Sequence, residues 1–514
     1  MIGLFTADQV RGAEQRVLSR LRPDALMQRA ATGLATVCLG LLGRAHGVRV
    51  VLLVGSGDNG GDALLAGARL AARGAQVHAV LLDPGRAHAA GVTALRRAGG
   101  RVVDADAAGL ERADLVLDGI VGIGGSGPLR PAAAELVRRA TAGPGLLVAV
   151  DVPSGVDADT GEVPGEAFPA QHTVTFGAVT TGLVVGAGRG RAGTVHLVDI
   201  GLADELPAPD AVQLTDADVA GHLEAPDADD DKYSRGVVGV LAGSATYPGA
   251  GVLCTGAALR TRPGLVRYAG TAADGVRAAW PEAIVTAGRP GDAGRVQAWV
   301  VGPGMGTDDD ARSVLAEVLA TDLPVLVDAD ALTMAAQEPD LVRRREAPTV
   351  LTPHDREFAR FGTEVGDDRV GAARRLAADL GAVVLLKGDA TVVAAPGGTA
   401  YVNGTGTPWL ATAGTGDVLS GLTGALLATG LPAAEAAAVG AHVHGRAGQR
   451  AAEGGPLIAG DLVRHLPATL GRLMTAEGAS QRAPASEERT EARNRARGHG
   501  LHRAPDDRLG DSGT

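Results

Sequence analysis

The chain of 514 residues is short of several residue types, and each shortage narrows the possible functions. Its only lysines are Lys232 and Lys387, and its only asparagines are Asn59, Asn403 and Asn494. Aromatic residues make up 2% of the chain, so its cores must be built from Val, Leu and Ala. Because this background supplies few lysines and asparagines, the positions that keep them are candidates for function, with chance placement as the alternative.

The chain also has few cysteines, and it has no excess of positive charge. Cys38 and Cys254 lie singly in Ala- and Leu-rich stretches, which predicts reduced, buried thiols rather than a disulfide framework or a zinc site. The net charge of −11 argues against nucleic acid as the main partner. The first 16 residues lack a signal-peptide core, and no apolar run approaches the ~18 residues of a membrane span. We therefore expect a cytoplasmic protein with no membrane partner.

The chain is rich in short, continuous apolar runs, most of them followed by an Ala-rich stretch. Runs without alternation are typical of strands buried on both faces, as in parallel sheets. Strands that alternate with helical stretches predict βαβ units and hence the α/β class. The predicted strands lie within 48–57, 75–83, 114–122, 145–155, 237–244, 298–304, 324–332, 348–354 and 382–389.

The series of runs pauses once, which predicts where the domains divide. A Pro- and Asp-rich, weakly apolar stretch at 206–231 is interpreted as a linker. It separates a first α/β domain at 1–205 from a second at 232–475. Residues 476–514 mix charges with few large apolar side chains, so they are predicted to form a disordered tail.

The first predicted strand ends in a glycine-rich turn. Residues 55–60 match the dinucleotide pattern G-x-G-x-x-G, so a hydride-transferring dehydrogenase is one alternative. However, Asn59 and Asp62 place an amide and a carboxylate on the loop where backbone N–H groups would meet a pyrophosphate. This chemistry favours a polar-ligand or metal site.

Other strand ends of the first domain carry similar chemistry. Asp118 precedes a second glycine-rich turn at 122–128, and Asp151 is soon followed by Ser154. Because ligands in open α/β sheets bind at the carboxyl ends of strands, these side chains and Asn59 can surround one cation and one polar ligand. Each aspartate alone has the alternative role of capping a helix, but as a set they favour a site.

In the second domain the strongest motif is TAGTGDVLSG at 412–421. Gly414, Thr415 and Gly416 at a helix N-terminus would direct free N–H groups at an anion. Asp417 would lie beside that anion site as a base for phosphoryl transfer to a hydroxyl. The alternative is that Asp417 only complements the helix dipole.

Four further motifs lie at or near predicted strand ends, and their order along the chain and their placement match a ribokinase-like nucleotide site. They are Lys387 in KGDAT, Asn403 in NGTG, His354 in TPH and the turn GPGMG at 302–306. Each also has a purely structural reading, as a surface lysine, a turn asparagine, a loop histidine or a Gly/Pro turn.

Together these motifs resemble a known family, the bifunctional NAD(P)H-hydrate repair enzymes. Residues 58–62, 118–122 and 151–157 resemble its epimerase domain, although Asp58 replaces an asparagine and Ala63 a common glycine. The motifs at 232–236, 242–251, 352–354 and 387–391 resemble its ADP-dependent dehydratase domain, in which Ala413 replaces a glycine. The resemblance implies a Rossmann-like three-layer domain followed by a ribokinase-like α/β domain.

The resemblance also implies the residues of an epimerase site. Asn59, Asp118 and Ser154 would hold a potassium ion, and Asp151 is the candidate catalytic acid and base. The hydrated dinucleotide would contact Asp58, Asn59, Gly60, Gly61, Asp62, Gly122, Ile123, Gly124, Gly125, Ser126, Gly127, Pro128 and Asp151.

For the second domain the resemblance implies that ADP phosphorylates the S-form hydrate with the help of Mg²⁺, and that Asp417 is the catalytic base. The nucleotide would contact Lys387, Gly388, Asp389, Ala390, Thr391 and Gly416. The hydrate would contact Ala250, Gly304, Gly306, His354 and Asp417. His442 and His444 are expected to pack or to lie at helix ends.

The predicted function is therefore repair of hydrated nicotinamide cofactors. The first domain would interconvert R- and S-NAD(P)HX, and the second would convert the S form to NAD(P)H while ADP becomes AMP and phosphate. The alternatives are a ribokinase-like small-molecule kinase with a Rossmann-like regulatory domain and a non-catalytic nucleotide sensor. The protein is expected to form a homo-oligomer.

Overall fold

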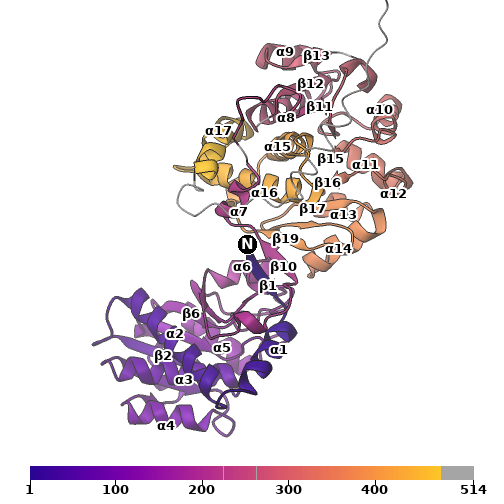
Figure 1. Ribbon diagram of the computed structural model, residues 1–514. Helices are drawn as coiled ribbons and strands as arrows, with labels where there is room; N and C mark the ends of the chain where they lie inside the picture. Colours follow the sequence, from indigo (N-terminus) through magenta and orange to yellow (C-terminus); the bar gives the residue numbers. More distant parts are fainter. Residues whose placement is uncertain (224, 262, 287, 476–514) are drawn as a thin grey trace, which may run out of the picture.

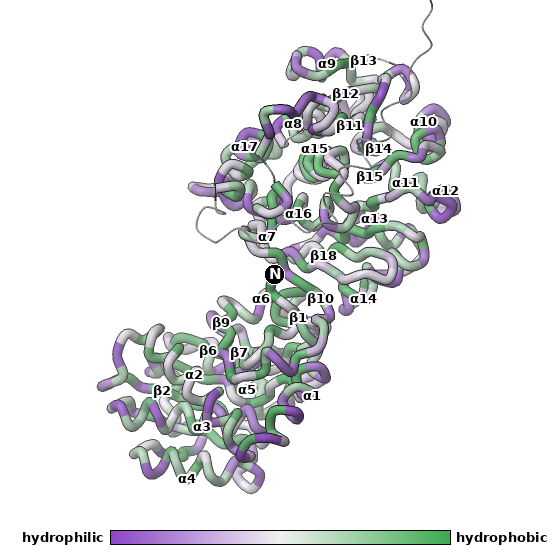
Figure 2. Tube along the Cα trace, in the orientation of Figure 1, coloured by the Kyte–Doolittle hydropathy of each residue, from purple (hydrophilic) through white to green (hydrophobic). Residues whose placement is uncertain are grey.

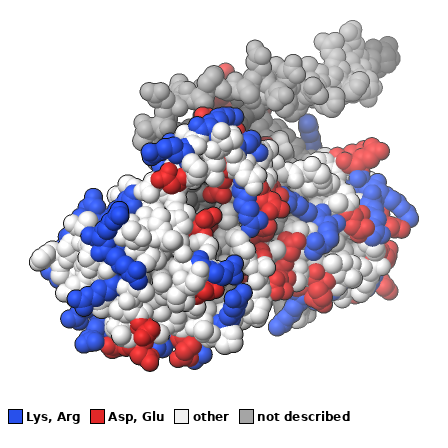
Figure 3. Space-filling model, turned by 90° about the horizontal axis from the view of Figure 1, so that it is seen from below, with Lys and Arg blue, Asp and Glu red and all other residues white. Residues whose placement is uncertain are grey.

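The computed structural model describes residues 1–475 apart from 224, 262 and 287. It contains two α/β bodies joined near the N-terminus (Figure 1). The predicted tail at 476–514 lies outside the described residues. On the face shown in Figure 3, acidic and basic side chains are interspersed rather than separated by sign.

The first body is a three-layer domain around a seven-stranded parallel sheet. Because both faces of its central strands are buried, the apolar runs are continuous rather than alternating. Helices α2 (Ala25–Leu42), α3 (Asp58–Ala71) and α4 (Ala89–Arg97) share a core with one face, and α5 (Pro131–Thr141) covers the other. The sheet order is β4 (Arg101–Val102), β3 (Gln76–Leu81), β2 (Arg49–Val54), β5 (Leu115–Gly119), β6 (Leu146–Val150), β7 (His172–Phe176) and β9 (Thr194–Val198).

Helix α2 corrects one expectation. By length and composition alone it is apolar enough to cross a membrane, so the statement that no apolar run approaches that length is wrong. In the structure its buried side is a stripe of small and apolar residues packed on the sheet and on α3. That stripe comprises Leu26, Ala30, Ala31, Leu34, Ala35 and Cys38, at the spacing of a helix that packs on a sheet.

The second body is also three-layered, around the parallel part of a longer sheet. Its core strands are β13 (Ile284–Thr286), β12 (Leu265–Ala269), β11 (Val237–Leu241), β14 (Ala298–Val301), β15 (Val325–Val327), β16 (Thr349–Leu351) and β17 (Val383–Leu386). One face packs on α8 (Pro248–Thr261), α15 (Thr415–Ala428), α16 (Ala433–Ala451) and α17 (Ala459–Thr475). The other packs on α10 (Asp309–Leu319), α11 (Asp330–Gln337) and α14 (Arg369–Leu380). Three shorter helices are α9 (Ala273–Ala279), α12 (Asp340–Arg343) and α13 (Asp355–Ala359).

The two bodies are joined by one continuous sheet. After β17 the sheet turns antiparallel through β18 (Thr391–Ala394) and β19 (Ala400–Asn403). It then continues into the first body through β10 (Ala211–Gln213), β1 (Ile2–Phe5) and β8 (Val179–Thr180). Figure 2 shows this junction as largely hydrophobic along β1 and β10.

The segment 206–231 is therefore more than the linker that its composition predicts. It contains β10, which pairs with strands of both bodies, and the short helix α7 (Asp216–Ala220). Asp216 accepts hydrogen bonds from His442 at 2.7 Å and from Arg446 at 2.8 Å. A strand of three residues is too short to give a periodic pattern, which is why the Pro and Asp content dominated the prediction.

Candidate active sites

The first candidate site lies where β2, β5 and β6 end side by side. Parallel pairing of these strands brings the turn after β2, Asp118 in β5 and Asp151 after β6 to one edge of the sheet. The turn after β2 requires glycine, because a Cβ on Gly55 would lie 1.9 Å from the carbonyl oxygen of Ile120. The missing side chain lets α3 begin against β5.

Asp118 and Ser154 form a buried pair. The backbone N–H of Ser154 donates to Asp118 Oδ2 at 2.8 Å, and its hydroxyl donates to Oδ1 at 2.7 Å. Asp118 is fully buried, and burial raises its pKa to about 6 although these hydrogen bonds oppose the rise. The backbone N–H of Val121 donates to Ser154 Oγ at 2.9 Å, which ties the pair to the second glycine-rich turn.

Asp151 has an unusual backbone conformation. Its φ is +69°, and among the described residues only Asp151 and Ala329 combine a positive φ with a side chain. The backbone N–H of Ile123 donates to Asp151 Oδ2 at 3.0 Å, and Thr175 Oγ1 donates to Oδ1 at 3.3 Å. Burial raises the pKa of Asp151. A strained backbone persists where its surroundings hold it, and active sites are common places for it.

Both polar atoms of the Asn59 side chain are buried without a hydrogen-bond partner. A Cβ on Gly122 would lie 3.2 Å from Asn59 Oδ1 and 2.8 Å from Asp151 Oδ2, so the three residues converge. An unpaired buried amide costs about 1–3 kcal/mol, which a ligand can remove.

The structure thus fits a hard cation at the predicted position. Asn59, Asp118 and Ser154 offer amide, carboxylate and hydroxyl oxygens, the donor types that such cations prefer. Only part of the predicted substrate turn at 122–128 lies at this site. Gly122 and Ile123 reach the site, whereas Gly124, Ser126, Gly127 and Pro128 are exposed.

The sequence did not single out two contributions from α1 (Ala7–Leu18). Arg11 donates to the carbonyl oxygen of Ile123 at 2.8 Å. Burial raises the pKa of Glu14 to about 7, with further increases from Asp151 and Asp58. A polar residue on an amphipathic helix such as α1 gives no sequence signal that distinguishes it from an exposed one.

Asp62 in α3, which the sequence did single out, has a buried oxygen without a partner, and burial raises its pKa strongly.

The second candidate site lies at the start of α15. Gly414 has a φ of +87° and precedes the helix, which begins at Thr415. Ala413 is not among the described residues with positive φ, so its replacement of glycine needs no strained backbone. Burial raises the pKa of Asp417 to about 7; the neighbouring Asp328 adds to the rise and Lys387 opposes it. A carboxyl group with this pKa suits a general base near neutral pH.

Lys387 lies close to the start of this helix, where a Cβ on Gly416 would be 3.7 Å from its Nζ, and it belongs to a network of charges. Its ammonium donates to Asp328 Oδ1 at 2.8 Å and lies 3.6 Å from Glu357 Oε2. Ser420 Oγ donates to Asp328 Oδ2 at 2.7 Å. Burial alone would raise the pKa of Asp328, but Lys387 and these hydrogen bonds hold it below its usual value. Lys387, which the resemblance places against the nucleotide, is therefore already paired with a carboxylate in this structure.

The predicted hydrate-binding residues come from the loops after β14 and β16 and from helices α8 and α15. A Cβ on Gly304 would lie 2.8 Å from the Cβ of Ala250, and Gly306 N–H donates to Asp330 at 2.9 Å. The imidazole of His354 caps α13, and its backbone N–H donates to Glu357 at 2.9 Å. Glu357 thus connects His354 to Lys387.

The other residues considered in the sequence, namely His444, Asn403 and the two cysteines, are buried or hydrogen-bonded within the fold. His444 Nε2 lies 2.9 Å from the carbonyl oxygen of Thr415, and burial lowers its pKa to about 4, so the ring is neutral. Asn403 donates to the carbonyl oxygens of Thr405 and Ala441, as a turn asparagine would. Cys38 and Cys254 are free and buried, as expected.

Both domains match known protein families. A family model described as NAD(P)H-hydrate dehydratase matches residues 238–468, and one described as YjeF-related protein N-terminus matches residues 23–182. The bifunctional NAD(P)H-hydrate repair enzyme Nnr of Mycobacterium leprae is 54% identical over 479 residues, which cover 91% of this chain and 99% of that one. Its Mycobacterium tuberculosis counterpart is 55% identical over 439 residues, or 84% and 91% of the two chains.

Among solved structures, the ADP/ATP-dependent NAD(P)H-hydrate dehydratase from Bacillus subtilis, co-crystallised with ATP and Mg²⁺, is 29% identical. The alignment covers 51% of this chain and 99% of that one, with a TM-score of 0.46. The full-length relatives match across both domains in one chain. The protein therefore belongs to the bifunctional NAD(P)H-hydrate repair enzymes.

Proposed function

We propose that Asp151 and Asp417 are the catalytic residues of two consecutive reactions on hydrated nicotinamide cofactors. The epimerase site converts R-NAD(P)HX to the S form, and the dehydratase site restores NAD(P)H from the S form at the expense of ADP. The observation that carries this proposal is that burial raises the pKa values of both carboxyl groups, Asp151 directly after β6 and Asp417 in the first turn of α15. Such groups are suited to exchanging protons near neutral pH.

In the epimerase site Asp151 is placed to act as acid and base. Epimerisation requires the C–O bond at the hydrated carbon to open and to close again on the other face. Asp151 can transfer a proton to and from that oxygen, while the N–H of Ile123 and the hydroxyl of Thr175 hold its carboxyl group in place. The turn at 122–128 and residues 58–62 would bind the dinucleotide around it.

A potassium ion at Asn59, Asp118 and Ser154 would supply positive charge beside the substrate. The unpartnered Asn59 amide supports this assignment, because its oxygen then gains a ligand. The same charge would keep Asp118 ionised despite its burial.

In the dehydratase site Asp417 would take the proton of the substrate hydroxyl. The hydroxyl oxygen then attacks the β-phosphorus of ADP, and AMP leaves as the bond to the α-phosphate oxygen breaks. The N–H groups at Gly414 to Gly416 stabilise the moving phosphoryl group. The ring nitrogen then drives cleavage of the C–O bond, which releases phosphate, and loss of a proton to water from the neighbouring ring carbon restores the double bond of NAD(P)H.

Mg²⁺ would neutralise charge on the phosphates of ADP in this site. No group of three His, Cys, Asp or Glu residues within the described part of the chain is arranged to hold a metal. This fits the usual preference of Mg²⁺ for substrate phosphates, water and one or two carboxylates. Asp330 is one candidate, since it lies beside Gly306 and close enough to raise the pKa of Asp417.

An assay with separated epimers tests the proposal. The S-form hydrate is mixed with the protein, Mg²⁺ and either ADP or ATP, and the near-ultraviolet absorbance of reduced nicotinamide is followed. We expect recovery with ADP, and recovery roughly 10²–10⁴-fold slower with Asp417→Asn. A protein that phosphorylates sugars and leaves both hydrates untouched would instead be the small-molecule kinase.

We also propose a cytoplasmic homo-oligomer. Several large apolar side chains are exposed in the monomer and would be covered by subunit packing, notably Leu197, Trp409 and Ile458. Sedimentation of the purified protein tests this proposal, which a monomer at micromolar concentration would contradict.

A further inference from the structure

An arginine of the first domain contacts two turns of the second. Arg189 lies on α6 (Gly186–Ala192) of the first body. One guanidinium nitrogen donates to the carbonyl oxygen of Gly404 at 2.9 Å. Another donates to the carbonyl oxygen of Asp389 and lies 3.4 Å from its carboxylate. The arginine therefore joins the KGDAT turn to the NGTG turn, and both belong to the second body.

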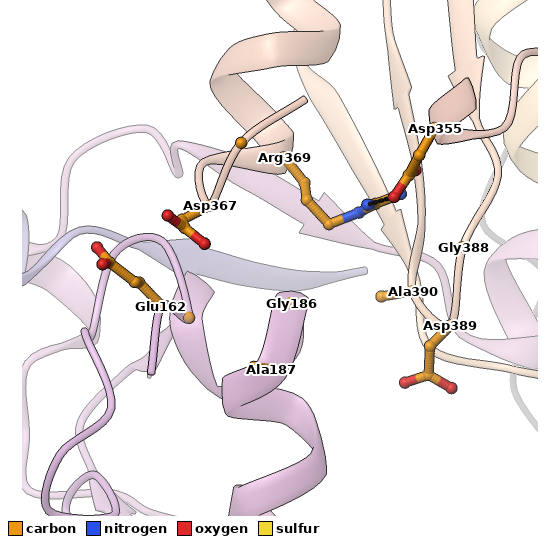
Figure 4. Close-up of a pocket in the computed structure, with 11 residues that line it drawn as sticks. Glu162, Gly186, Ala187, Asp355, Asp367, Arg369, Gly388, Asp389 and Ala390 are labelled. Carbon is orange, nitrogen blue, oxygen red and sulfur yellow. Dashed lines mark hydrogen bonds and ion pairs between the residues drawn. The ribbon is translucent and has the colours of Figure 1, made fainter. Parts of the chain in front are cut away.

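The KGDAT turn is held from its other side as well. Arg369 on α14 donates to the carbonyl oxygen of Lys387 at 2.9 Å and pairs with Asp355 at 2.9 Å (Figure 4). Two guanidinium groups, one from each domain, thus hold main-chain oxygens of this turn. Hydrogen bonds from a charged donor are the stronger kind, and the planar fork of arginine fixes direction as well as distance.

The same turn faces a cavity between the domains. The cavity measures about 310 Å³ and is lined by Glu162, Gly186 and Ala187 from the first domain and by Arg369, Gly388 and Ala390 from the second. In Figure 4 the α6 segment and the 388–390 turn lie on opposite sides of this space. The first domain therefore forms one wall of the space in front of the turn.

We infer that Arg189 is a positioning residue for the nucleotide site of the dehydratase, so that the epimerase domain completes that site. The inference rests on the proposed function, in which residues 387–391 contact ADP. With Arg189 in place, the 388–390 turn has one position relative to the turn at 404. Without it, binding ADP must also order the KGDAT turn, and that cost weakens affinity for the nucleotide.

The test compares Arg189→Ala, Arg189→Lys and a matched control, Arg191→Ala. Arg191 lies on the same helix, and no hydrogen bond or ion pair of its side chain is found among the described residues. Each full-length variant is assayed with saturating S-form hydrate and varied ADP. We expect the KM for ADP to rise about tenfold in Arg189→Ala, the effect of losing two or three charge-assisted hydrogen bonds across a partly exposed contact, with little change in kcat.

Four further readouts separate a positioning role from general damage to the fold. Arg189→Lys should recover part of the ADP affinity, because lysine can reach one carbonyl oxygen but not both. The epimerase rate should be unchanged in all three variants, and Arg191→Ala should match the wild type in every assay. Equilibrium binding of ADP, followed by calorimetry, should weaken by the same factor as KM rises.

An unchanged KM for ADP in a folded Arg189→Ala protein would overturn the inference. So would an equal loss of both activities together with a lowered Tm, because that pattern indicates a structural role only. If the wild type itself shows no ADP-dependent dehydration, the proposed function fails instead, and the two failures are distinguishable.

Discussion

The two active sites use the same kind of group but prepare it in different ways. Asp151 is held by two hydrogen bonds on a strained backbone, next to an amide that has no partner. Asp417 lies in the first turn of a regular helix whose start is close to Lys387, and this lysine is already paired with Asp328. The first site therefore keeps an amide without a partner, whereas the buried lysine of the second is already paired with a carboxylate.

This difference is consistent with the proposed K⁺ held by the first site and the proposed Mg²⁺ that binds with ADP in the second. A buried amide without a hydrogen-bond partner in the first site costs free energy, and a bound ion would remove that cost. In the second site the buried carboxylate and ammonium satisfy each other, and the substrate brings its own charge as phosphate. Each of the following predictions tests one side of this comparison.

The largest effect is expected at Asp417. Asp417→Asn keeps the shape of the side chain but removes the base, so dehydratase kcat should fall by roughly 10²–10⁴-fold. Stopped-flow recovery of reduced nicotinamide from pure S hydrate measures this fall. The epimerase rate of the same protein is the control, and a parallel loss there would show that the two sites are not independent.

Next is the internal ion pair of the second site. Lys387→Met leaves Asp328 buried without its partner, which should lower the free energy of unfolding by about 3–5 kcal/mol. Urea unfolding gives the value. The chain offers a control in its other lysine, since Lys232 is exposed and stacks only over the ring of Tyr233 at 5.3 Å. Lys232→Met should stay within ~0.5 kcal/mol, and equal losses would refute the pairing argument.

The pH profile of the dehydratase should show the raised pKa of Asp417. The carboxylate must be deprotonated to accept a proton, and that form predominates only above its pKa of about 7. Below that pH, kcat/KM should fall about tenfold per pH unit. Above it, this carboxyl group should cause no further change in kcat/KM. An acidic limb with a midpoint near the ordinary value for aspartate would contradict this reading of the site.

The smallest effect concerns the cation of the first site. Asn59→Ala removes one neutral oxygen ligand, so the K⁺ concentration for half-maximal epimerase rate should rise roughly threefold to tenfold, in line with ~1 kcal/mol per such contact. Titration with KCl at constant ionic strength, against choline chloride, measures it. If the epimerase proves indifferent to K⁺, the unpartnered amide serves another ligand.

Sequence alone predicted most of the frame of these sites. The apolar runs located β2, β5, β6, β11, β14, β15, β16 and β17, because strands buried on both faces leave a continuous hydrophobic signal. Polar residues at their ends then placed Asp118, Asp151 and Asp417 correctly at strand or helix ends. The order of the motifs along the chain was enough to identify the family.

What the sequence did not predict depends on contacts between distant parts of the chain. The pairing of Lys387 with Asp328 and the reach of Arg189 to Asp389 leave no local pattern, because 59 and 200 residues separate the partners. The sheet that joins the domains was missed because β8 and β10 are only two and three residues long. Pro and Asp content there predicted a linker instead.

The account is tested most directly by a mixture of R and S hydrates given ADP, Mg²⁺ and K⁺. Wild-type protein should restore the reduced nicotinamide of the whole mixture. Asp151→Asn should restore the S fraction at the wild-type rate and leave the R fraction, since its dehydratase site is untouched. Consumption of both epimers by Asp151→Asn at the wild-type rate would contradict the division of work between the two domains.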